Sequence, residues 1–176
     1  MIGDKLYIPK ELNNGHPCNT QADNTLTAKI NNIDFTAEII GGRYDEDPRK
    51  KQEEKKWIRR SWGRGPLLPT DTDHTLIFIS INWDIEGEQT YNLADDNPVV
   101  NVGFTNRFPA ADGDEFKFLV PVTSGSLTIK HDVETLTAEG TFEFVARLFQ
   151  SDGTVLRFEV KEGKFFVGPT KQGSVA

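Results

Sequence analysis

This chain of 176 residues carries a formal net charge of −7, and 36% of its residues are hydrophobic. The length fits one domain with tails, and a domain of this size can bury a sizeable core. The negative charge argues against nucleic-acid binding by the whole surface. A single cysteine, Cys18, rules out an internal disulfide. No apolar run approaches the ~18 residues of a membrane span, and the first residues lack the apolar segment of a signal peptide. We therefore expect no membrane insertion, and a cytoplasmic protein or part of an exported particle.

The N-terminal segment, residues 1–24, is polar and is interrupted by prolines and glycine. It predicts an extended arm, which is either a loosely held tail or an arm that docks on a neighbouring subunit. The β-domain is expected over residues 25–168, followed by a tail at 169–176. Its first two strands, at 25–30 and 33–40, flank the turn pair Asn31-Asn32 and predict a hairpin that ends at Gly41-Gly42.

A charged insert follows at residues 43–70. Between Arg43 and Arg64 the chain has nine basic and five acidic residues, whereas the whole chain has 20 basic and 27 acidic residues. Asp47-Pro48 is typical of a helix start, so we expect one short charged helix near residues 48–60, or a loop.

The remaining elements read as strands. Apolar residues on both faces of Thr75–Trp83 indicate a central strand covered on both sides. The segment Asp84–Gly87 predicts a hairpin turn into a strand at 89–93, and further strands are expected at 99–104 and 115–120. Three long alternating strands follow between Ser126 and Val167, the last two joined by a tight turn at 150–153.

Nine or ten strands at this spacing predict an all-β fold, either an antiparallel β-sandwich or a partly closed barrel. We expect a largely buried aromatic and aliphatic core formed by Phe35, Ile77, Ile79, Phe142, Phe144, Phe158 and Phe165.

Two stretches resemble a bacterial family of uncharacterised small all-β domains, which are often lipoproteins. The first stretch is the strand–turn–strand of residues 26–37. The second combines a Gly-Thr-Phe strand at Gly140-Thr141-Phe142 with a final Gly-x-Phe strand at Gly163-Lys164-Phe165. The resemblance implies an all-β domain with a cell-surface or exported setting, and it carries no catalytic residues.

Candidate catalytic and metal-binding residues are few. The histidines His16, His74 and His131 lie in separate segments, and no nucleophile motif surrounds a serine or Cys18. Asp112, Asp114 and Glu115 are weak candidates for calcium, because Asp-rich turns are common without a metal. We expect no cofactor.

Cations interleaved with tryptophan give the charged insert its functional character. Aromatic and arginine side chains are frequent at interface hot spots, so a protein partner is expected to bind at Trp57, Arg59, Arg60, Trp62 and Arg64. The alternative is a segment that packs on its own sheet. The sequence thus favours a non-enzymatic structural or interaction protein, a subunit or accessory of a larger assembly. Its main alternative is a surface module that binds carbohydrate.

Overall fold

The computed structural model describes residues 24–46, 57–82, 85–93, 99–109 and 119–168. These residues form ten β-strands: β1 (Thr25–Ile30), β2 (Ile33–Thr36), β3 (Ile39–Glu46), β4 (Trp57–Gly65), β5 (Asp73–Asn82), β6 (Gly87–Asn92), β7 (Val100–Pro109), β8 (Val122–Asp132), β9 (Thr137–Phe149) and β10 (Val155–Val167). None of the described residues is helical. Among them, no helix has the length and apolar character needed to cross a membrane.

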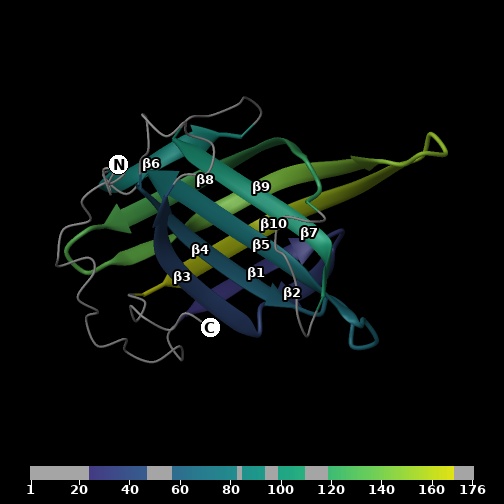
Figure 1. Cartoon of the computed structure of the whole chain (residues 1–176), viewed down its shortest axis with the longest axis horizontal. Coiled ribbons are helices and arrows are strands. Elements are labelled where there is room, and N and C mark those ends of the chain that lie inside the picture. The colour runs from purple at the N-terminus through teal and green to yellow at the C-terminus, as the bar shows by residue number, and fades with distance from the viewer. Residues whose placement is uncertain (1–23, 47–56, 83–84, 94–98, 110–118, 169–176) are drawn as a thin grey trace, which may run out of the picture.

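The strands form two antiparallel sheets that pack face to face (Figure 1). The six-stranded sheet has the order β2-β1-β10-β9-β8-β6, and the four-stranded sheet has the order β3-β4-β5-β7. This is the expected β-sandwich. Strands that alternate apolar and polar residues point their apolar side chains toward the facing sheet.

The core between the sheets is aromatic and aliphatic, and all seven side chains predicted to be buried are buried. Phe104 of β7 connects the sheets, because its ring lies 5.9 Å from the ring of Phe144 in β9 and 5.0 Å from that of Phe158 in β10. Strand β5 is buried on both faces from Thr75 to Asn82, as its continuous apolar pattern predicted.

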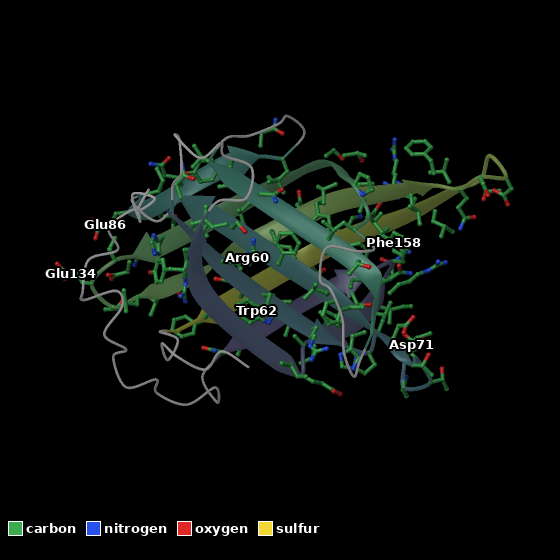
Figure 2. All side chains as sticks on the ribbon, in the orientation of Figure 1. Arg60, Trp62, Asp71, Glu86, Glu134 and Phe158 are labelled. Carbon is green, nitrogen blue, oxygen red and sulfur yellow. The ribbon has the colours of Figure 1, made fainter. Side chains whose placement is uncertain are left out.

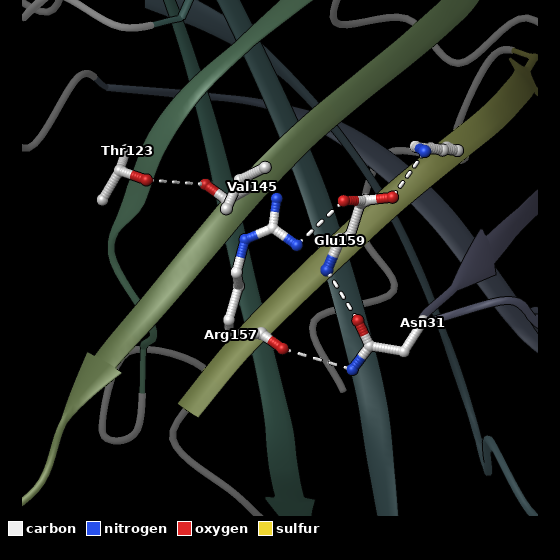
Figure 3. Close-up of polar contacts among 6 residues, drawn as sticks. Asn31, Thr123, Val145, Arg157 and Glu159 are labelled. Carbon is white, nitrogen blue, oxygen red and sulfur yellow. Dashed lines mark hydrogen bonds and ion pairs between the residues drawn. The ribbon is translucent and has the colours of Figure 1, made fainter. Parts of the chain in front are cut away.

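The first turn of the domain confirms its prediction and also ties two strands together. Asn31 and Asn32 have φ values of 49° and 65°, the left-handed conformation that a tight hairpin turn needs. The Asn31 side chain also forms two hydrogen bonds with the backbone of β10. Its Nδ2 donates to the Arg157 carbonyl at 3.2 Å, and its Oδ1 accepts from the Glu159 amide at 2.8 Å (Figure 3).

Three sequence expectations need correction. Gly41 and Gly42 do not end an element but lie inside β3, where a Cβ on Gly41 would approach the Trp62 ring to 2.4 Å. The chain instead changes sheet between β2 and β3. The segment Asp84–Gly87 is not a hairpin turn, since β6 pairs with β8 in the other sheet. Residues 57–60, placed in a charged helix or loop, form part of β4; the rest of that helix, like residues 115–118, lies outside the described residues.

Candidate functional site

The outer face of the six-stranded sheet, the side turned away from the core, is hollowed. The hollow is an open groove of about 690 Å³ that crosses strands β2, β1, β10, β9 and β8. A second hollow of about 200 Å³ lies over β8, β9 and β10, and Glu143 lines both. The larger hollow is called the outer-face groove below.

A β-bulge in β10, a central strand of this sheet, explains why the face is hollowed. Thr27 pairs with Lys164 and Lys29 with Lys161, so two steps along β1 correspond to three along β10. The same irregularity separates Val160 from Gly163 against β9. An inserted residue bends its strand and increases the local twist, and the bulge residues Glu162 and Gly163 line the groove.

Glu162 shows that the bulge is held in a costly conformation. Its φ of 51° lies in the left-handed region, which non-glycine residues seldom occupy and which costs of order 1–3 kcal/mol. Such residues persist where the surrounding structure enforces them, often at binding sites. The Glu162 carboxylate lies 3.5 Å from the Lys29 amine, so the bulge places an ion pair within the groove.

Hydroxyl groups line the groove on both sides of β10. Strand register aligns six residues in one row across the whole sheet, in the strand order β2, β1, β10, β9, β8, β6: Thr36, Thr27, Lys164, Thr141, Thr128 and Thr90. Five of the six are threonines. The first five line the groove, and Thr90 extends the row by a 2.8 Å hydrogen bond between its hydroxyl and that of Thr128. This set is called the threonine row below.

The charges on this face balance one another. The groove is lined by Lys29 and Lys164 together with Asp34, Glu143 and Glu162. Beside it, Glu159 forms ion pairs with Lys161 and with Arg157, the latter at 2.8 Å (Figure 3). Hydrogen bonds from Lys161 and Arg157 lower the pKa of the Glu159 carboxyl. The face therefore presents many polar groups but little net charge.

The residues predicted to bind a partner, Trp57, Arg59, Arg60, Trp62 and Arg64, all lie in β4 of the four-stranded sheet. Arg59, Arg60 and Arg64 are called the arginine set below. Arg59 is fully buried and Arg60 is 5% exposed, both within β4. Trp62 is half-buried, and Figure 2 shows it with Arg60 over the four-stranded sheet. The Arg60 and Arg64 guanidinium groups lie over the rings of Phe78 and Phe108, at 5.8 and 4.9 Å. These contacts are within the protein's own sheet.

Burial of Arg59 has a structural cause. Its Nη2 donates to the carbonyl oxygens of Gly168 at 2.8 Å and Val167 at 3.4 Å, and its guanidinium lies 5.0 Å from the centre of the Tyr44 ring. Arg59 thereby links β4 of one sheet to the end of β10 in the other. Trp57 pairs with Glu46 in the β3–β4 ladder. Asp112, Asp114, Glu115, His16 and Cys18 lie outside the described residues.

A buried histidine sits beside Arg59. His131 is fully buried; its Nδ1 lies 2.8 Å from the Ile85 carbonyl oxygen and its Nε2 lies 3.1 Å from the Tyr44 hydroxyl. Because the carbonyl can only accept, Nδ1 carries the proton, and Nε2 accepts from Tyr44 when the ring is neutral. Burial lowers the pKa of His131, and the neighbouring Arg59 adds to this, against the opposing effect of the Ile85 bond. Burial also raises the pKa of Tyr44.

Stability should fall as the pH drops through the titration range of this histidine. Below the unfolded value of 6.5, the unfolded chain binds a proton that the folded chain resists, until the pH reaches the lower folded pKa. Urea midpoints measured at about pH 7.5 and about pH 5.5 should show the loss, and His131→Gln should reduce it. The pKa values of Asp132 and Asp152 are also lowered by their hydrogen bonds. These carboxyls change stability at a more acidic pH than the histidine does. An equal change of the urea midpoint between the two pH values in wild type and in His131→Gln would contradict the assignment of this pH dependence to His131.

No group of three or more His, Cys, Asp or Glu side chains in the described ranges is arranged to hold a metal ion. No family model, no curated protein and no solved structure matches this chain. The function must therefore be argued from the chain's own sheet face, its groove and its buried polar contacts.

Proposed function

We propose that this protein is a non-enzymatic interaction protein, a subunit or accessory of a larger assembly, and that it binds its partner with the outer face of the six-stranded sheet. The observation that carries the proposal is the groove over the β10 bulge, with Glu162 held at a φ of 51°. A bulge interrupts ladder hydrogen bonds, and its usual positions are sheet edges and functional sites. Here it interrupts a central strand, where it has no role in protecting an edge.

The groove offers many groups that form hydrogen bonds. Its described lining residues include neither histidine nor cysteine, which are the commonest general base and the strongest neutral-pH nucleophile. Hydroxyls, two amines and three carboxylates remain, and these groups suit recognition through many hydrogen bonds. This composition supports a binding role.

The arginine set stabilises the fold and is not part of the proposed partner surface. Arg59 joins the two sheets, and Arg60 and Arg64 lie on phenylalanine rings of the four-stranded sheet. Arg59 and Arg60 are therefore held within the fold, and we assign the partner surface to the opposite sheet.

Amide chemical shifts test this assignment directly. Isotope-labelled protein is mixed with the protein fraction and, separately, with the polysaccharide fraction of an extract from its source cells. We expect one fraction to shift the amides of Thr27, Thr128 and Thr141 while leaving those of β5 unchanged. Thr141→Arg, which places a long side chain over the groove, should abolish the shifts. No outer-face shift with either fraction would refute the proposal.

The second candidate function is carbohydrate binding, and the threonine row is the observation that favours it. Five hydroxyl-bearing side chains lie in one line across the sheet, interrupted only by Lys164, and each can both donate and accept hydrogen bonds. A sugar chain presents groups of the same kind.

A further inference from the structure

The threonine row has a length and direction that a ligand can follow. Neighbouring strands lie ~4.8 Å apart, so a row across six strands spans roughly 24 Å. It runs perpendicular to the strands, and the outer-face groove lies along its first five members, from Thr36 to Thr128. A ligand in this groove is therefore elongated and crosses the strands.

Threonine hydroxyls define the chemistry that such a ligand must offer. Each hydroxyl is one donor and an acceptor with two lone pairs, and it rotates to suit its partner. Of the row, Thr36, Thr141, Thr90 and Lys164 are exposed, and Thr27 and Thr128 are half-buried. Only the Thr90–Thr128 pair is joined by a hydrogen bond between hydroxyls of the row, so Thr36, Thr27 and Thr141 keep their capacity for bonds to a ligand.

The balanced charge of the groove and the burial of its aromatic residues exclude the other classes of elongated ligand. Nucleic acid or an anionic membrane surface requires a clear excess of cations, but the groove has two amines against three carboxylates. An extended peptide would pair with a free strand edge and place side chains in apolar pockets. The groove lies on a sheet face, and its aromatic lining residues Phe35 and Phe142 are only 1% and 3% exposed.

One partly exposed aromatic side chain adjoins the row. Phe166 lies two residues beyond Lys164 in β10, so strand alternation puts it on the same outer face. It pairs with Thr25 and Glu139 in the next row of the sheet and is half-buried. A planar ring at this position can stack on the apolar face of a sugar ring. The hydroxyls of the threonine row can form hydrogen bonds with the hydroxyl groups at the edge of that ring.

We infer that the outer-face groove binds a neutral polysaccharide chain that runs across the strands along the threonine row, with one sugar ring against Phe166. This inference rests on the proposed contact face and on the second candidate function, because it names the class of carbohydrate that this face binds. The bound chain exchanges hydrogen bonds with Thr27, Thr36, Thr128 and Thr141, and Lys164 donates to it from the middle of the row.

Soluble neutral polysaccharides provide the probe. Binding of a β-glucan, a xylan and a mannan is measured by calorimetry, with an anionic polygalacturonate for comparison. We expect at least one neutral chain to bind, with an affinity that is the same at low and high salt. The double variant Thr128→Val and Thr141→Val keeps the side-chain shape but removes two hydroxyls. It should weaken binding by about 30-fold, since each lost hydrogen bond contributes about 1 kcal/mol.

Matched variants separate a lost contact from a damaged fold. Thr141→Ser keeps the hydroxyl and should retain binding, whereas Thr70→Val, at an exposed turn away from the groove, should change nothing. Phe166→Ala should weaken binding further. Equal affinity of the Thr→Val double variant and wild type would overturn the inference, as would binding of polygalacturonate alone. Outer-face shifts with the protein fraction and no neutral chain bound would also overturn it, while leaving the proposed contact face in place.

Discussion

Replacing Phe144 with alanine should lower the free energy of unfolding by about 3–5 kcal/mol, the range for truncating a fully buried phenylalanine. Phe144 is 2% exposed, and its ring packs edge-on against Phe104 of the opposite sheet and stacks on Phe142. The truncation therefore leaves a cavity at the contact between the sheets, where flanking strands cannot move inward without breaking their ladders. Urea unfolding monitored by circular dichroism measures the change.

The same strand offers a control with the same chemical change. Phe149 ends β9, and its side chain is 70% exposed where the β9–β10 hairpin projects beyond the sandwich (Figure 1). Phe149→Ala should shift stability by no more than about 0.5 kcal/mol, as most exposed substitutions do. If both variants lost similar stability, the inner face of β9 would not be the core contact described here.

Replacing Arg59 with alanine should destabilise the fold by about 2–4 kcal/mol. A hydrogen bond from a charged donor contributes about 1.5–3 kcal/mol, and the aliphatic stem adds packing that alanine lacks. The variant also leaves the carbonyl oxygens of Val167 and Gly168 without the guanidinium donor they share. Thermal unfolding and urea unfolding of the same sample should both report the loss.

The Arg59 experiment separates the two roles that its sequence context allows. A solvent-facing arginine on a docking surface would affect partner association and leave folding nearly unchanged. Arg107 of β7 is exposed and supplies the control, because Arg107→Ala should change stability by less than about 0.5 kcal/mol. Equal stability of Arg59→Ala and wild type would contradict the structural role of Arg59 and favour a role in binding a partner.

Much of the fold follows from local sequence pattern. Alternation along residues 126–167 defined three long strands, because a pleated strand sends successive side chains to opposite faces. The Asn31-Asn32 turn was predictable because asparagine tolerates positive φ. Continuous apolar residues in 75–82 indicated a strand covered on both sides, and the aromatic residues of alternating strands were correctly placed in the core.

Pairing between distant strands was not readable from the same patterns. Alternation gives a strand its two faces but does not identify its neighbour. The sequence therefore predicts a hairpin between β5 and β6, whereas β6 pairs with β8. The charged segment was read as a helix or loop because its composition is dominated by lysine, arginine and glutamate. Its last part is a strand, since burial of Arg59 against backbone carbonyls and Tyr44 offsets the cost of a cation in the interior.

The sequence by itself determined the all-β fold class, the core residues and the Asn31-Asn32 turn, because these depend on residue pattern within single segments. Only the tertiary structure decided the candidate site. The five threonines of the threonine row come from three separate parts of the chain, namely the β1–β2 hairpin, β6 and the β8–β9 hairpin. Each threonine alone reads as an ordinary strand residue. They form one row because hydrogen-bond register fixes which residues of neighbouring strands lie side by side, and a one-residue slip in any ladder would turn that strand's threonine to the opposite face.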